Sequence, residues 1–180
     1  QDQTIRFMTS ASSSIHRHAF NFGVILFLFL LNACSIKFNP ADTGELKTYY
    51  IPQFINNADN TLPNLPIQLS EALKDKIRLQ STLKYTDEDP DIELRGTLVD
   101  FRISSEAPRV GETTAINRLT ITLAVEYFNN RTQKEVWKRN FSFFYNYPAD
   151  QDFSTVQEVA IRTISNQLME DIFNAAFSDW

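Results

Sequence analysis

The chain has 180 residues, of which 17 are basic and 22 are acidic, and its formal net charge is −5 at pH 7. This mildly acidic balance lacks the basic footprint of general nucleic-acid binding, so no nucleic-acid partner is expected. The length fits a single domain. The single cysteine excludes an internal disulfide, so stability must come from a packed apolar core, which a chain of this size can build.

An apolar run near the start of the chain leads directly to that cysteine, Cys34. Residues 24–31 are all large and apolar, and a basic segment, residues 16–18, lies upstream. A basic segment, a short apolar core and small residues are typical of a secretory signal, and the core is too short to span a bilayer. We therefore expect residues 1–33 to be a signal peptide that is removed, with Met8 as a start that gives an ordinary signal length.

The residues around the expected cleavage point, Leu31-Asn32-Ala33-Cys34, resemble a bacterial lipobox. This resemblance implies diacylglyceryl transfer to the Cys34 thiol, cleavage before Cys34, and acylation of the new amino terminus. Residues 34–45 then form a tether and residues 46–180 the folded domain. The alternatives are a soluble secreted protein, a signal anchor, or a cysteine that is simply a small buried hydrophobe.

The mature chain has few residue types suited to catalysis. Both histidines, His16 and His18, leave with the signal, and the only thiol is predicted to carry lipid. This excludes Ser-His-Asp and Cys-His pairs and metal sites built on His or Cys. The acidic segment 87–91 lacks the spacing and the glycine of an EF-hand, so a solvated turn is expected there rather than a Ca²⁺ site. We predict no enzyme, no cofactor and no metal, and a carboxylate-based hydrolase is the weakest alternative.

The first half of the mature chain reads as strand, loop, helix and strand. Residues 47–54 favour a strand that lies at an edge or ends at Pro52, since proline cannot donate a ladder hydrogen bond. A loop rich in Asn and Pro, residues 56–66, follows. Residues 65–79 carry apolar side chains every four positions, which predicts an amphipathic helix. Residues 81–86 read as a short strand.

Three longer strands follow in the prediction. Residues 91–104 alternate between apolar and polar side chains, but the alternation slips by one near Leu98, which predicts a β-bulge. Residues 119–127 show the cleanest alternation in the chain. A hairpin turn at residues 129–132 leads to a partner strand at residues 136–147.

The last predicted element is a long helix that reaches almost to Trp180. Ser154 has capping-box spacing to Gln157 and is the expected N-cap. The apolar stripe of this helix comprises Val156, Val159 or Ala160, Ile164, Leu168, Ile172 and Ala175. The predicted fold class is therefore α+β: a two-layer sandwich of a mostly antiparallel four- to five-stranded sheet with two helices packed on one face.

Several segments together resemble the LPS-assembly lipoprotein family LptE, in its Bacteroidetes form. These segments are the lipobox ending in Cys34, Tyr49-Tyr50-Ile51, Leu69-Ser70-Glu71-Ala72-Leu73-Lys74-Asp75-Lys76, Ile92-Glu93-Leu94-Arg95-Gly96, Asn117-Arg118-Leu119-Thr120-Ile121, and Asp171-Ile172-Phe173-Asn174 with Trp180. Each motif is weak alone, and their order and spacing over the mature chain carry the resemblance.

The resemblance implies a two-layer α+β plug inside an outer-membrane LPS-translocon barrel of the LptD type. Such a protein assists assembly of the barrel and insertion of lipopolysaccharide at the cell surface by binding, without a cofactor. No acidic run follows Cys34, where the chain reads Ser35-Ile36-Lys37. This favours a lipid-anchored outer-membrane protein that faces the periplasm or lies in the barrel lumen.

Three arginines are candidates for contact with lipopolysaccharide or the barrel: Arg102, Arg109 and Arg118. They lie on strand ends or in the loop between the two central strands, and lipopolysaccharide carries phosphates. The simpler interpretation is that exposed strand arginines provide solubility and protect edges. Two other functions stay open: a pilotin-like lipoprotein adaptor of another envelope secretion machine, and a small-lipid carrier with a cavity between helix and sheet.

Overall fold

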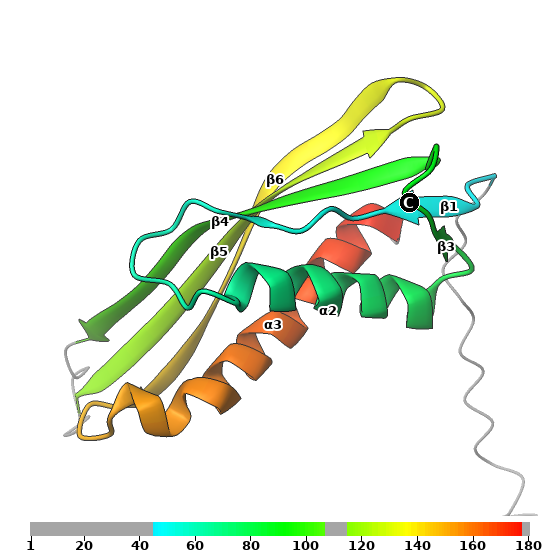
Figure 1. Ribbon diagram of the computed structural model, residues 1–180. Helices are drawn as coiled ribbons and strands as arrows, with labels where there is room; N and C mark the ends of the chain where they lie inside the picture. The colour runs from blue at the N-terminus through cyan, green and yellow to red at the C-terminus, as the bar shows by residue number, and fades with distance from the viewer. Residues whose placement is uncertain (1–44, 107–114, 178–180) are drawn as a thin grey trace, which may run out of the picture. The chain divides into compact units, whose positions relative to one another are not determined.

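The structure is a computed structural model that describes residues 45–106 and 115–177, and Figure 1 shows their arrangement. The expected signal peptide and Cys34, most of the tether, the loop with Arg109, and Trp180 lie outside these residues. The elements, in chain order, are β1 (Thr48–Tyr50), β2 (Ile55–Asn56), α2 (Leu65–Gln80), β3 (Lys84–Tyr85), β4 (Ile92–Glu106), β5 (Ile116–Asn129), β6 (Lys134–Pro148) and α3 (Phe153–Phe177).

All six strands belong to one sheet, in the order β3-β1-β4-β5-β6, and β2 also pairs with β4. The long strands β4, β5 and β6 are antiparallel neighbours, whereas β1 pairs in parallel with both β3 and β4, and β2 pairs in parallel with β4. The parallel pairing of β1 with β3 requires a crossover connection, and the chain that carries α2 supplies it. The predicted α+β sandwich is thus confirmed, with six strands in a mixed sheet.

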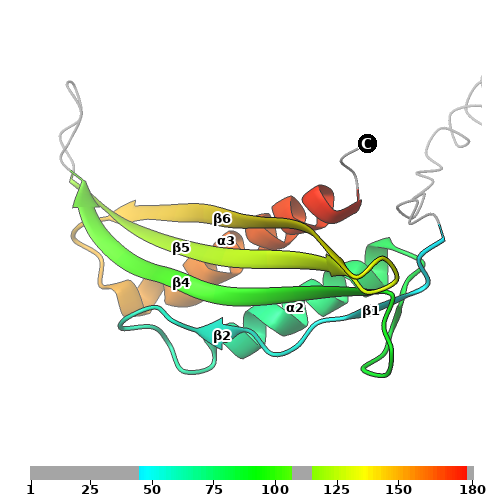
Figure 2. The ribbon, with the colours of Figure 1, turned by 90° about the horizontal axis from the view of Figure 1, so that it is seen from above.

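Both helices cover the same face of the sheet, as predicted. Figure 2 looks onto the opposite face, with α2 and α3 behind the strands. Helix α3 packs on β5 and β6, and α2 packs on β4 and against α3. An ion pair between Lys76 of α2 and Glu170 of α3 joins the two helices, and its hydrogen bond lowers the pKa of the Glu170 carboxyl.

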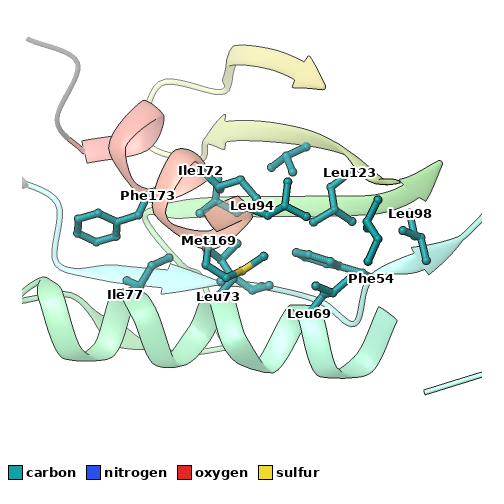
Figure 3. Packing of buried hydrophobic residues seen from close by; sticks show 14 of the residues in the cluster. Phe54, Leu69, Leu73, Ile77, Leu94, Leu98, Leu123, Met169, Ile172 and Phe173 are labelled. Atoms are coloured by element: carbon teal, nitrogen blue, oxygen red, sulfur yellow. The ribbon is translucent and has the colours of Figure 1, made fainter. Parts of the chain in front are cut away.

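The core lies between the sheet and the two helices, where Figure 3 shows side chains from all of these elements in one cluster. The predicted helix stripe Leu69, Leu73 and Ile77 has no exposed surface. The apolar positions that alternate along β5 are also buried. The apolar side chains that repeat with the helix period of 3.6 residues and those that repeat with the strand period of two residues therefore pack into one contiguous core.

The slip in apolar alternation along β4 is a β-bulge, as predicted. The register with β5 shifts between Leu98 and Asp100. Leu98 is buried before the bulge, and Phe101 packs against the core after it. The extra residue, Val99, restores apolar side chains to the helix face.

The first predicted strand, residues 47–54, is interrupted in the structure. β1 ends at Tyr50, and β2 begins at Ile55 further along the same edge of β4. Pro52 lies in the interruption, which agrees with the expectation that the strand ends there. Phe54, in the same interruption, is buried beneath β4. Its ring lies 2.6 Å from the position that a Cβ would take at Gly96, so only glycine fits there.

The prediction that Ser154 caps the last helix is wrong. Helix α3 begins at Phe153, and the preceding residue, Asp152, accepts a hydrogen bond of 2.8 Å from the Ser154 backbone N–H. This bond satisfies one of the free amides of the first turn, which is the function of an N-cap. The Ser154 side chain and backbone N–H both lower the pKa of the Asp152 carboxyl, because they bond its charged form.

Candidate functional site

The three long strands expose one whole face to solvent, because both helices cover the other face (Figure 2). Side chains alternate between the two faces, so the positions between the buried residues of β5 point away from the helices. We call this surface the open face. It comprises Arg95, Thr97, Asp100, Arg102 and Ser104 on β4, Arg118, Thr120, Thr122, Ala124 and Glu126 on β5, and Lys138, Asn140, Ser142, Phe144 and Asn146 on β6.

The open face is polar, and its side chains bond one another across the strands. The hydroxyls of Thr122 and Ser142 share a hydrogen bond of 2.9 Å. Glu126 bonds Lys138 on the next strand and raises the pKa of that ammonium group. Cross-strand pairs of this kind stabilise a sheet while leaving its polar groups in contact with water. The surface is therefore suited to a wet or hydrogen-bonding environment.

Arg118 is a cation of the open face with contacts to several neighbouring side chains. Its Nε donates a hydrogen bond of 2.9 Å to Asn146 Oδ1, and its guanidinium lies 4.2 Å from the centre of the Phe144 ring. One of its other nitrogens lies 3.5 Å from Glu106 Oε1. These four residues form the Arg118 cluster. Only 28% of the arginine side chain is exposed, and its charge is held in place by neighbours on the two flanking strands, β4 and β6.

Arg102 lies on the same face as Arg118, on the neighbouring strand. Arg102 is opposite Thr120, two positions along β5 from Arg118, so the two arginines are diagonal neighbours. Arg102 is 66% exposed and lies 3.7 Å from Asp100. The structure thus brings two of the three predicted arginines to one end of the open face, each beside a carboxylate, and Arg109 lies outside the described residues.

The described part of the chain offers hydrogen-bonding and charged side chains on its surface. Within residues 45–106 and 115–177, no three His, Cys, Asp or Glu side chains gather into a set that could hold a metal ion. In the same ranges no helix is long and apolar enough to cross a membrane. A pocket of about 380 Å³ lies where Trp137 on β6 meets Ala175 and Ala176 of α3, at the low end of the range for small-molecule sites.

Asp91, in the acidic segment 87–91, has a structural role that the prediction of a solvated turn did not include. Asp91 Oδ2 accepts hydrogen bonds from the backbone N–H of Lys47, at 2.7 Å, and of Thr48, at 3.0 Å. Arg131, from the turn between β5 and β6, donates to the Glu45 carbonyl at 2.9 Å and lies 3.8 Å from Asp91 Oδ1. We call these five residues the N-terminal clamp.

The N-terminal clamp stabilises the ionised form of Asp91. The bond from the Lys47 amide is the largest cause of the lowered pKa of this carboxyl, burial opposes it, and the bonds from Thr48 and the charge of Arg131 add to the lowering. The clamp encloses a hollow of about 430 Å³. Its effect is to fasten the start of the described chain to β4 and to the β5–β6 turn. The backbone N–H of Asp91 in turn donates a hydrogen bond to the Thr48 hydroxyl. Because the partners of Asp91 all lie far from it in the sequence, no short sequence motif signals the clamp.

Comparison with solved structures shows the same kind of fold in another protein. A hypothetical protein of Chlamydia trachomatis, CT253, aligns with a TM-score of 0.53 at 8% identity over 72% of this chain and 95% of that one. A minor lipoprotein of Acinetobacter baumannii gives 0.45 at 12% identity over 71% and 89%. Uncharacterized lipoprotein B of Nitrosomonas europaea gives 0.49 at 11% identity over 71% and 79%. Only the first of these scores is high enough to support a shared fold.

No curated protein matches the sequence. The sequence profile of the LptE family, described as lipopolysaccharide-assembly, matches residues 46–176. This match covers nearly all of the described domain, from the N-terminal clamp to the last turn of α3. It includes every strand and both helices. The chain therefore belongs to the LptE lipopolysaccharide-assembly family.

Proposed function

We propose that this protein is an outer-membrane lipoprotein subunit of the lipopolysaccharide translocon. It assists assembly of an LptD-type barrel and insertion of lipopolysaccharide at the cell surface, and it acts by binding rather than catalysis. The observation that carries the proposal is the match of the lipopolysaccharide-assembly family to residues 46–176. The open face of the sheet supports it, because it supplies a broad polar surface for binding.

The membrane anchor in this proposal is the lipid on Cys34. Each buried acyl CH₂ contributes about 0.8 kcal/mol, and stable anchoring takes at least two lipid chains. A triacylated Cys34 meets this requirement. The short tether to Glu45 then keeps the domain close to the membrane that contains its barrel partner.

The barrel partner fits the polarity of the open face. The interiors of outer-membrane barrels are polar, and a plug inside one needs hydrogen-bonding side chains on its outer surface. Thr120 and Thr122 of β5 and Ser142 and Asn146 of β6 provide such groups in register. The apolar residues that alternate with the threonines along β5, Leu119, Ile121 and Leu123, are buried under the helices.

Contact with lipid A phosphates is assigned to the arginines of the open face and the adjoining loop. Arg102 and Arg118 are diagonal neighbours at the end of the sheet where the chain leaves β4 and enters β5. Arg109 lies between those strands in the sequence, outside the described residues. Arginine is suited to phosphate because its planar donors bind oxygen pairs. The nearby Glu106 and Asp100 limit the net positive charge, so we expect modest affinity.

Depletion of the protein tests the proposed function as a whole. Surface lipopolysaccharide and correctly assembled barrel should both fall, and re-expression of the wild-type chain should restore them. Normal levels of both after depletion would refute the proposal. Extraction in mild detergent should recover the barrel with the lipoprotein. Recovery of another envelope machine would favour the pilotin-like adaptor, and a lipid retained by an unlipidated, detergent-free preparation would favour the lipid carrier.

Charge reversal tests the arginine contact separately. The triple variant Arg102→Glu, Arg109→Glu, Arg118→Glu should lose most lipopolysaccharide binding and slow barrel assembly. The matched control reverses three exposed cations on other elements: Arg78, Lys84 and Arg162. Unchanged binding and assembly in the first variant, or equal losses in both, would remove the arginines from the function.

A further inference from the structure

The outer edge of β6 is an unpaired strand edge 15 residues long. β6 is the last strand in the sheet order, and β5 is its only strand neighbour among the described residues. The opposite edge of the sheet ends in β3, which has two residues. Natural proteins usually keep edge strands short or charged, because their free N–H and C=O groups attract other strands. The short edge at β3 follows this rule, whereas the 15-residue edge at β6 departs from it in length.

The two halves of β6 differ in charge. Residues 134–140 include Lys134, Glu135, Lys138 and Arg139. Residues 141–147 read Phe-Ser-Phe-Phe-Tyr-Asn-Tyr and contain no charge, no proline and no glycine, and Pro148 then ends the strand. The first half thus carries the usual protection of an edge, and the second half carries none. We call residues 141–147 the uncharged edge.

Except for Tyr147, which is buried, the side chains of the uncharged edge are at least partly accessible, and they lie on both faces of the sheet. Phe144, on the open face, is 45% exposed. Phe141, Phe143 and Tyr145, on the helix face, are only partly buried against the core. A strand added beside β6 would cover these rings with its own alternating side chains, and aromatic cross-strand pairs stabilise a sheet.

We propose that the uncharged edge accepts an added β-strand from another polypeptide. The occupant is an extended, uncharged segment of about seven residues with alternating apolar side chains, which pairs antiparallel to β6. Its backbone would continue the ladder of β4, β5 and β6, and its side chains would give specificity. This inference goes beyond the proposed function and does not depend on it, because it rests only on the edge position, the charges and the exposed side chains of β6.

The length and the charges of β6 favour a peptide segment over a second copy of this chain. Stable interfaces between folded proteins usually bury about 1,000 Å² or more, and a seven-residue strand pair alone gives a small contact. Added peptide strands of this length bind mainly through their backbone. In antiparallel pairing, the carboxyl end of the partner segment points toward the charged half of β6, so an acidic residue just beyond the uncharged segment would complement Lys138 and Arg139.

Photocrosslinking in the intact cell tests the inference with the full-length lipoprotein. A p-benzoyl-phenylalanine placed at Phe144 on the edge should crosslink to one segment of one partner protein. The same probe at Thr120, its register neighbour on the central strand, should not yield this product. Identification of the crosslinked peptide by mass spectrometry shows whether it has the predicted apolar alternation.

A lysine at the edge should block the added strand. Ser142→Lys places a charge in the uncharged edge, and Thr122→Lys places the same charge at the opposite position in register on β5. Both variants lose the same hydroxyl–hydroxyl bond. Matching melting curves would show that both fold, and only Ser142→Lys should reduce the Phe144 crosslink, by at least about tenfold.

Amide hydrogen exchange decides whether the captured segment forms a strand. The segment, made as a synthetic peptide, should slow exchange within residues 141–147 and leave residues 134–140 unchanged. A crosslink that joins only two copies of this chain would overturn the proposal. Equal crosslinks at Phe144 and Thr120, an absence of product at Phe144, or peptide binding without amide protection would do so as well.

Discussion

The helix face and the open face of β4, β5 and β6 are built from alternate residues of the same strands, yet they obey different constraints. Side chains on the helix face are fixed by burial, and Leu119, Ile121 and Leu123 have no exposed surface. Side chains on the open face bond one another in exposed cross-strand pairs, such as Thr122 with Ser142. The residues of the helix face therefore specify the fold, and the residues of the open face can be adapted to a binding partner.

The largest expected difference between the two faces comes from neighbouring positions of β5. Leu123→Ala should lower the free energy of unfolding by about 2–5 kcal/mol, because it leaves a cavity in the core. Thr122→Ala should lower it by less than about 1 kcal/mol, because it removes only an exposed hydrogen bond. Urea unfolding of the two variants measures both effects, and similar losses would contradict the division between the faces.

Gly96 tests how tightly the helix face is packed. Gly96→Ala should cost about 1–3 kcal/mol, because the added methyl group meets the Phe54 ring and the core must shift. Thr97→Ala, the next residue on the open face, is the matched control and should cost much less. Phe54→Leu combined with Gly96→Ala should cost less than the sum of the two single changes, and an additive result would mean that the ring is not the obstacle.

Replacement of Asp91 tests whether a partly buried polar contact stabilises the fold more than the exposed pairs of the open face do. Its pKa is lowered in the folded state, so its stabilising effect is present above the ordinary value near 3.8 and is lost as the pH falls through the folded-state value. Asp91→Asn should cost about 1–3 kcal/mol at pH 7 and should flatten the loss of stability on acidification below about pH 5.

Chemical unfolding across a pH series measures the effect of Asp91. Asp87→Asn, which changes an exposed carboxylate of the same acidic segment, is the control and should keep the wild-type acid profile. If both variants behave alike, the N-terminal clamp is not the source of the acid dependence.

The smallest expected effect separates the two arginines of the open face. Arg118→Ala should cost about 0.5–1 kcal/mol, because it removes a cation–π contact and the bond to Asn146. Arg102→Ala should stay within about 0.5 kcal/mol, as is usual for an exposed position. Thermal unfolding compares them, and equal effects would show that the Arg118 cluster contributes nothing beyond an ordinary surface residue.

The long elements were predictable because their periods are set locally. β5 alternates over residues 119–127 and α2 carries a stripe through Leu69, Leu73 and Ile77, so either pattern identifies its own buried face. The bulge of β4 was predictable for the same reason, since a slip in alternation has few structural solutions. These three elements define most of the sheet and half of the helical layer.

The short elements and the ends of elements were not predictable in the same way. β2 has two residues, too few for any period, and it exists because β4 pairs with it across the fold. β3 lies within the short strand predicted at residues 81–86, but its bounds of two residues are set by its pairing with β1. Asp152 and Ser154 are both good N-caps by residue type, and only the path of the chain before α3 decides between them. Asp91 was read as part of a solvated turn because its partners, Lys47 and Arg131, are far away in the sequence.

The candidate site was predictable in part. The open face followed from the alternation of residues 119–127, and it includes Arg102 and Arg118 as neighbours. Phe144 and Asn146, which hold Arg118 in place, come from β6 and become visible only through its register with β5. The expected lipidation of Cys34 and the position of Arg109 lie outside the described residues and stay predictions.

The N-terminal clamp also has a mechanical consequence. A tension applied to the chain ahead of Glu45 reaches the bonds of Arg131 and Asp91 before it reaches β1, which has only three residues. These bonds pass the force to the start of β4 and to the β5–β6 turn. A domain held by a short tether can therefore bear a pulling force from its membrane anchor without separation of β1 from the sheet.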